Sequence, residues 1–152
     1  MVEANSTNQV LESDRLPDPL NDRVINSVKR PPIIPLSTER VFPNGVNTAN
    51  ADINAELVKN YLFEGGKISK ECLLEIMRRV KPVLSAEPNL VRVNGKVVIV
   101  GDIHGQFYDL VAMLRKLKGK ASSAGKLLFL GDYVDRGNYG PEVAAYLFVL
   151  KL

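Results

Sequence analysis

The sequence predicts an α/β protein in which helices come first and a strand-helix-strand-helix unit follows. Two short apolar runs, at 97–100 and 127–130, have the composition of buried strands. After each run, apolar residues recur at the spacing of an amphipathic helix. Alternating strands and helices are typical of a parallel sheet with helices packed on it.

Residues 1 to about 50 have the composition of an arm and not of a core. They contain most of the prolines, which fix φ and lack an N–H donor: Pro17, Pro19, Pro31, Pro32, Pro35 and Pro43. We expect a disordered arm over 1–20, an extended proline-rich segment over 21–50, and a folded domain over 51–152. The apolar stretch 30–36 is expected to pack on the surface of that domain. The alternative is a ligand for an aromatic groove.

Two helices are expected before the first strand. The first has one apolar face and ends at Gly65-Gly66; the face comprises Asp52, Ile53, Leu57, Tyr61 and Leu62. Ser69 is a suitable N-cap for the second, which Pro82 should kink or end. Its inward residues are predicted to be Leu73, Ile76, Met77 and Val80. Cys72, the single cysteine, lies in this pattern and should be buried.

The sheet should begin with a hairpin. Asn94-Gly95 separates 91–93 from 96–100, and this dipeptide between two β-rich runs is typical of a tight turn. The run 97–100 should be buried on both faces. A helix follows from Phe107 to Leu117, then a loop over 119–125, the second strand, and a helix opened by Pro141. The last helical pattern continues to Leu152 without a stop signal, so we expect 51–152 to be the N-terminal part of a truncated domain.

The composition excludes several classes of protein. The formal net charge is +3 and the pI is about 9.0, which is too mild to indicate nucleic-acid binding. The first residues, 1–5, are polar and lack the positive flank and apolar segment of a signal peptide, and the longest apolar run is too short to span a membrane. We therefore expect a protein of the cytoplasm or the nucleus that acts without nucleic acid or membrane.

Chemistry-bearing residues follow both strands. The segments are Gly101-Asp-Ile-His-Gly105 and Gly131-Asp-Tyr-Val-Asp-Arg-Gly137. Because the carboxyl ends of parallel strands meet at one sheet edge, Asp102 and Asp132 should lie side by side. Adjacent carboxylates need a cation or a shared proton, and oxygen ligands with the imidazole of His104 suit manganese, zinc or iron. The four glycines of these segments should supply positive φ and close backbone approach.

Arg136 and Asp135 complete the pattern. An arginine fork matches a phosphate oxyanion, and Asp135 is placed to orient a neighbouring histidine. Each segment alone could be a tight turn with a structural histidine or a surface ion pair. Their conjunction favours a metal-dependent site for phosphate-ester hydrolysis.

At these residues the sequence resembles the phosphoprotein phosphatase family of serine/threonine phosphatases. The arm at 21–28, with Pro31-Pro32 and residues 52–76, is similar to the amino-terminal part of calcineurin catalytic subunits. The resemblance implies a metallophosphoesterase-like α/β sandwich and two metal ions, iron and zinc or manganese. By position, Asp102 and His104 would bind the first ion and Asp132 would bridge both. Arg136 would hold the phosphate, and Asp135 would orient the catalytic histidine.

The resemblance also indicates what this chain lacks. His104 is its only histidine, so the family's catalytic histidine and the other ligands of the second ion are not among these residues. A calcineurin-type parent would bind a phosphoprotein substrate, a calcium-binding regulatory subunit and calmodulin, the last two through segments absent here. We expect the chain alone to be inactive. Two alternatives stay open: a metallophosphoesterase acting on small esters or dinucleotides, and a short form that binds partners through its arm.

Overall fold

A computed structural model describes residues 8–20, 23, 27–46, 52–118 and 125–152. The chain divides into two compact units, residues 1–78 and 79–152, and each is described by itself. The sequence-based domain boundaries at 20/21 and 50/51 remain predictions. No described helix has the length and apolar character needed to cross a membrane.

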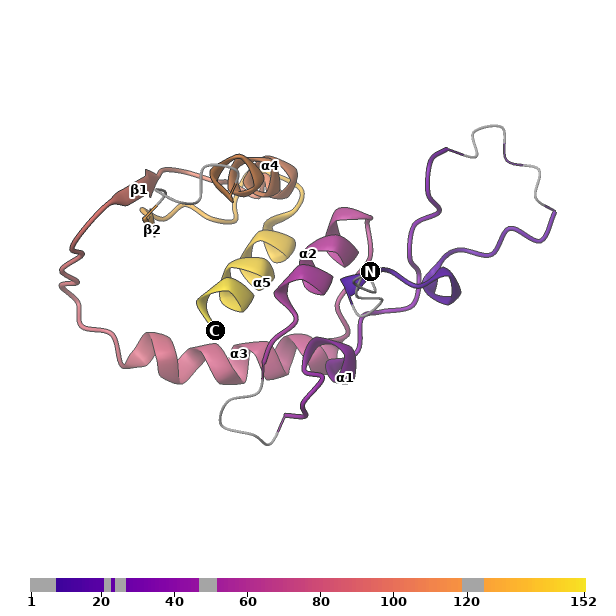
Figure 1. Ribbon diagram of the computed structural model, residues 1–152, viewed down its shortest axis with the longest axis horizontal. Coiled ribbons are helices and arrows are strands. Elements are labelled where there is room, and N and C mark those ends of the chain that lie inside the picture. Colours follow the sequence, from indigo (N-terminus) through magenta and orange to yellow (C-terminus); the bar gives the residue numbers. More distant parts are fainter. Residues whose placement is uncertain (1–7, 21–22, 24–26, 47–51, 119–124) are drawn as a thin grey trace, which may run out of the picture. The chain divides into compact units, whose positions relative to one another are not determined.

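The first unit contains the arm and most of the helices expected before the sheet (Figure 1). Its elements are the 3₁₀ turn η2 (Glu12–Asp14), α1 (Thr38–Val41), α2 (Ala55–Phe63) and the larger part of α3 (Lys70–Ser85). Two polar side chains cap these helices, because each accepts from a free N–H of the first turn. Asn54 Oδ1 accepts from Leu57 N at 3.0 Å, and Ser69 Oγ accepts from Cys72 N at 3.2 Å. Ser69 is therefore the N-cap that the sequence predicts.

The expectation that residues 1 to about 50 stay outside the core is wrong for their last part. Leu36, Val41 and Phe42 are almost fully buried. Leu36 also pairs through its backbone with the segment before α3, donating to Lys67 O at 2.8 Å and accepting from Ser69 N at 3.0 Å. Apolar side chains in a proline-rich segment thus pack into the first unit, because burying them is favourable even where the backbone is irregular.

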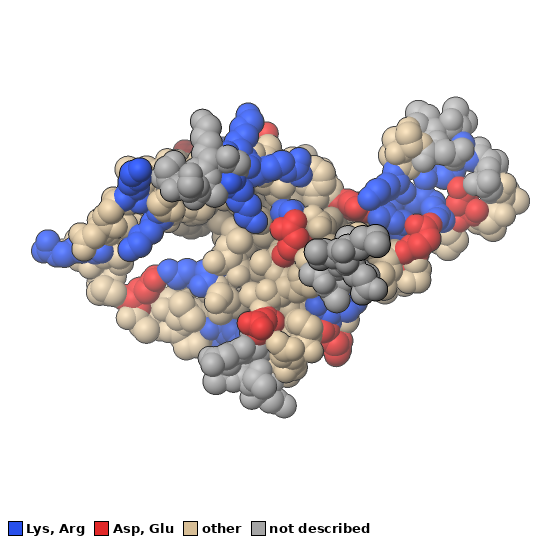
Figure 2. Space-filling view, viewed as in Figure 1, with Lys and Arg blue, Asp and Glu red and all other residues tan. Residues whose placement is uncertain are grey.

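Ion pairs hold the earlier part of the arm. Arg15, whose side chain is 6% exposed, contacts Glu64 of the α2 end at 2.5 Å and Glu12 at 3.4 Å. Glu12 also pairs with Arg30, and Asp14 with Arg40. In Figure 2 the Lys and Arg side chains of the arm lie next to Asp and Glu side chains. These charges are therefore largely neutralised within the unit.

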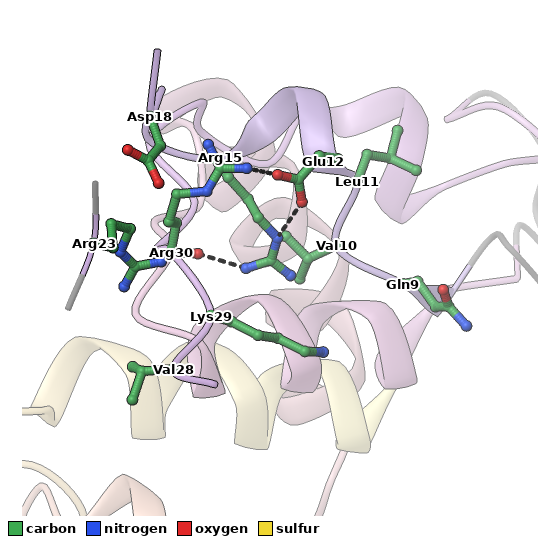
Figure 3. A pocket seen from close by; sticks show the side chains of 10 residues that line it. All are labelled: Gln9, Val10, Leu11, Glu12, Arg15, Asp18, Arg23, Val28, Lys29 and Arg30. Carbon is green, nitrogen blue, oxygen red and sulfur yellow. Dashed lines mark hydrogen bonds and ion pairs between the residues drawn. The ribbon is translucent and has the colours of Figure 1, made fainter. Parts of the chain in front are cut away.

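A pocket of about 790 Å³ lies among these arm residues (Figure 3). Its charged lining includes Arg15, Arg30 and Glu12, which the dashed lines of Figure 3 join to one another. None of the motif residues lines it. The pocket is consequently a feature of arm packing and is separate from the predicted chemistry.

Three expectations for the two helices need correction. Asp52 and Ile53 precede α2 and are not part of it; Asp52 instead accepts from Asn44 Nδ2 at 3.2 Å. Met77 is 47% exposed, because Cys72, Ile76 and Val80 form the buried stripe. Of the two outcomes expected at Pro82, a kink or the end of the helix, the end is wrong, because α3 continues to Ser85. The φ of proline fits a helix, so its cost here is one missing hydrogen bond and crowding against the preceding turn.

The second unit contains the expected strand-helix-strand-helix order. Strands β1 (Val97–Val100) and β2 (Lys126–Phe129) pair in parallel, with Val97 opposite Lys126 and Val100 opposite Phe129 (Figure 1). Helix α4 (Phe107–Lys118) follows β1 and α5 (Gly140–Lys151) follows β2. The two helices pack through Phe107 and Tyr146, whose ring centroids are 6.0 Å apart. The predicted mixed α/β class is thus confirmed, as a small parallel sheet with helices.

The predicted hairpin is wrong. Gly95 has the φ of a turn, +90°, but residues 91–94 form no strand, and β1 pairs only with β2 among the described residues. Val91 is 56% exposed, so the short run has no apolar face to bury, and an isolated hairpin is marginally stable in water. The burial of 97–100 on both faces is wrong as well, since Ile99 is 64% exposed while Val100 is buried.

Candidate metal centre

The site lies at the carboxyl ends of the two strands. Asp102 follows the end of β1 by two residues, and Asp132 follows the end of β2 by three. A further bond, from Leu130 N to Val100 O at 3.0 Å, continues the pairing beyond the strands. The two acidic residues therefore leave the sheet at the same edge, as the sequence predicts.

Backbone hydrogen bonds join the two loops directly. The N–H groups of Ile103 and His104 both donate to Asp132 O, at 3.0 and 2.8 Å. Gly105 N donates to Tyr133 O at 2.9 Å, and Tyr139 N donates to Gly105 O at 3.2 Å. The main chains thus hold the two loops against each other.

Three non-glycine residues of these loops have left-handed backbone conformations. The φ angles are +46° for His104, +47° for Asp132 and +66° for Arg136, and no other described non-glycine residue has positive φ. This conformation is uncommon for residues with a Cβ and costs energy that the surroundings must offset. Such strain is concentrated at functional sites, and here it falls on three of the five residues to which the sequence assigns chemistry.

Glycines permit the close contact between the loops. Gly105 has φ +70°, and a Cβ on it would lie 2.9 Å from Gly137 O. A Cβ on Gly137 would lie 2.2 Å from His104 O. The sequence predicted positive φ at four glycines; Gly131 and Gly105 have it, whereas Gly101 and Gly137 are not among the positive-φ glycines. Gly137 is instead required for close approach.

The side chains of Asp102, His104 and Asp132 converge. His104 Nε2 lies 3.4 Å from Asp102 Oδ2 and 3.7 Å from Asp132 Oδ2. One ligand atom from each residue lies within 4.8 Å of the others. The His104 nitrogens are buried and have no hydrogen-bond partner among the described residues. The carboxylate side chains are 66% and 63% exposed.

This donor set fits a metal ion. An unpartnered buried imidazole between two carboxylates lacks a stabilising contact, and a cation bound there would supply one for all three groups. Two oxygen ligands and one nitrogen are the set that manganese, iron or zinc accepts. The open carboxylate side also leaves room for a substrate oxygen.

Asp135 and Arg136 are placed differently. Both are exposed, and within the described ranges no hydrogen bond or ion pair joins either side chain to the three ligand residues. Their assigned roles remain predictions. Sequence reasoning did not foresee the left-handed φ of Arg136, which no residue pattern signals. It also did not single out Tyr139, whose N–H anchors the second loop to the first.

The chain is similar to known phosphatases. Residues 95–152 match the family of calcineurin-like phosphoesterases. The chain is 36% identical over 139 residues to serine/threonine-protein phosphatase 2B catalytic subunit A1 of Saccharomyces cerevisiae, across 87% of this chain and 24% of that protein. It is 35% identical to subunit A2 of the same yeast, across 87% of this chain and 21% of that protein. Serine/threonine-protein phosphatase T of Schizosaccharomyces pombe is 39% identical, across 64% of this chain and 21% of that protein.

The family match over both loops and the similarity of most of the chain to these phosphatases define the class as calcineurin-like phosphoesterases. Within that class, the chain belongs to the phosphoprotein phosphatase family and is similar to the catalytic subunits of protein phosphatase 2B. The predicted resemblance is therefore confirmed. The chain spans about a quarter of the length of these relatives.

Proposed function

We propose that the protein acts in the hydrolysis of phosphoserine and phosphothreonine in proteins by a two-metal mechanism. The observation that carries this proposal is the Asp102–His104–Asp132 cluster at the ends of two parallel strands. The relatives named serine/threonine-protein phosphatases support the substrate class.

The residues of the two loops would have different roles in this mechanism. Asp102 and His104 would help to hold one ion, and Asp132 would help to hold that ion and a second. A pair of such ions supplies charge stabilisation for the attacking and leaving oxygens of the phosphoryl group. Arg136 would bind the phosphate through its planar fork, and its exposed position leaves the guanidinium accessible. Asp135 would orient a histidine outside these residues through a hydrogen bond.

The chain supplies one side of such a centre. His104 is its only histidine, so the remaining imidazole ligands and the general acid must come from residues outside these 152. We infer that the chain works as part of a larger calcineurin-type phosphatase. Three further proposals follow from this inference. The ions would be iron and zinc, or manganese. The partners would be a calcium-binding subunit and calmodulin, and the protein would act in the cytoplasm.

The test is hydrolysis of a phosphoserine peptide by the full-length product of the gene, isolated through an epitope tag. Asp132→Asn should lower kcat/KM at least a hundredfold, because the carboxylate that would help to hold both ions is lost. Asp109→Asn removes the same charge from an exposed position in α4 and should leave turnover within twofold.

Other outcomes would contradict the proposal. If the full-length enzyme prefers a dinucleoside polyphosphate to the phosphopeptide, the proposed substrate class is wrong. If Asp132→Asn has undiminished turnover, the proposed metal mechanism is wrong.

A further inference from the structure

Two tyrosines pack edge to face immediately beyond the metal-binding loops. The ring centroids of Tyr108 and Tyr139 are 5.0 Å apart, with an interplanar angle of 90°. Both side chains are partly exposed, at 38% and 39%. Edge-to-face pairs contribute stabilisation beyond the area that they bury. Neither tyrosine belongs to the ligand set or to the residues assigned a chemical role above.

The positions of these rings connect the two loops. Tyr108 lies in the first turn of α4, four residues after His104. Gln106, directly before that turn, donates its N–H to Ile103 O at 3.0 Å. Tyr139 is the N-cap of α5, and its N–H donates to Gly105 O at 3.2 Å. The ring pair therefore adds a side-chain link between two segments that the backbone already brings together.

Neighbouring aromatic groups hold Tyr108 in place. Its ring contacts Phe107 at 5.8 Å between centroids, and Phe107 in turn contacts Tyr146 of α5. Burial raises the pKa of Tyr108, and a side-chain hydrogen bond with Tyr139 and the charge of Glu142 raise it further. The ring of Tyr108 thus contacts both Phe107 and Tyr139.

We propose that Tyr108 and Tyr139 form a clasp that holds the two loops in the register in which His104 lies beside Asp132. They are positioning residues for the metal centre, and in that respect the proposal rests on the proposed function. The hydrogen bonds that the clasp should protect are those from the amides of His104 and Gly105 to Asp132 O and Tyr133 O in the other loop.

Hydrogen exchange of the metal-free chain tests the clasp without any metal. In Tyr139→Ala the amides of His104 and Gly105 should exchange about threefold to tenfold faster, the range that an aromatic pair provides. The Leu130 amide, bonded to Val100 O between the strand ends, is the internal reference and should change less than twofold. Tyr139→Phe keeps the ring and should remain within twofold of the unmodified chain.

Manganese binding by the same variants supplies the second readout. Affinity for Mn²⁺ should fall about threefold to tenfold in Tyr139→Ala and recover in Tyr139→Phe. Leu150→Ala is the matched control, because it truncates a side chain of α5 that is 43% exposed.

The outcomes separate the two proposals. Unchanged exchange at His104 and Gly105 in Tyr139→Ala, or an equal change in Leu150→Ala, would overturn the clasp. Faster exchange in Tyr139→Ala, combined with no Mn²⁺ binding by the unmodified chain, would support the clasp and overturn the proposed metal centre.

Discussion

At the scale of single residues, burial decides which chemically active groups can react. Cys72 and His104 are both enclosed, yet their surroundings differ. Cys72 is fully buried in the α3 stripe, and burial raises the pKa of its thiol to about 12 from an ordinary value of 9.0. His104 lies between two exposed carboxylates. Cys72 is therefore a packing residue, whereas His104 is a candidate metal ligand.

Cys72 should be inert in the folded chain. Because the thiolate is the reactive form, labelling by a disulfide reagent at pH 8 should be at least a hundredfold slower than in urea. The raised pKa also makes the folded state hold its proton longer than the unfolded state. This contribution to stability is present below pH 9 and is lost as the pH rises toward 12. Rapid labelling without denaturant would contradict the buried position.

Individual residues also show where sequence reasoning stops. The 30-residue separation of Asp102 and Asp132 predicts that they meet, because it equals about one strand-helix-strand unit. The left-handed φ of His104, Asp132 and Arg136 has no signal in the sequence, since those residue types more often have negative φ. Hydrogen bonds between the loops, from Ile103 N and His104 N to Asp132 O, accompany the left-handed conformation of His104 and Asp132.

At the scale of the elements, turns and caps determine the local structure. The contact between Gly137 and His104 O leaves no space for a methyl group, whereas a Cβ on Gly101 would meet nothing within 4 Å. Position 137 is therefore crowded and position 101 is open, although both belong to the same two loops.

Gly137→Ala should therefore destabilise the second unit by about 1–3 kcal/mol, as overpacking does, and lower Mn²⁺ affinity. Gly101→Ala should stay within about 0.5 kcal/mol. Urea unfolding followed by tyrosine fluorescence measures both. Equal stability of the two variants would contradict the close approach of the loops.

The cap of α3 offers a second test. Ser69→Ala removes the acceptor for Cys72 N and should cost about 1 kcal/mol in the free energy of unfolding. Ser69→Asp keeps an acceptor and should restore most of the loss. If alanine and aspartate behave alike in urea, the side-chain cap contributes nothing.

Elements were predicted unevenly for physical reasons. α4 has a clear apolar stripe, whereas α5 is apolar on most of its faces and is marked by Pro141 in its first turn. The bounds of both helices agree with the sequence to within a few residues. The prediction of a hairpin was wrong because an Asn-Gly dipeptide indicates only a local turn, whereas the pairing of two strands depends on an apolar face that they can bury. The prediction that Met77 points inward was wrong because three- and four-residue spacings fit more than one helical stripe. The buried stripe is the one through Cys72, Ile76 and Val80.

At the scale of the whole molecule, the histidine content limits the chemistry. One imidazole and two bridging-capable carboxylates can hold an ion, but a two-metal centre with a general acid needs more ligands than these residues provide. The family and the mixed α/β class could be predicted from two motifs, whereas the source of further ligands belongs to the proposal that the chain is part of a larger phosphatase.

The 152-residue chain should accordingly show no phosphopeptide turnover above the buffer rate with Mn²⁺ present. The same assay on the full-length product serves as the positive control. Turnover by the short chain that Asp132→Asn abolishes would contradict the need for outside ligands.

The measurement that most directly tests the metal centre is the amount of manganese retained by the purified chain after equilibrium dialysis. The geometry of Asp102, His104 and Asp132 predicts one ion per chain. Retention should fall below about a tenth in Asp132→Asn and remain unchanged in Asp109→Asn. No retained ion in the unmodified chain, or the same retention in Asp132→Asn, would contradict the assignment.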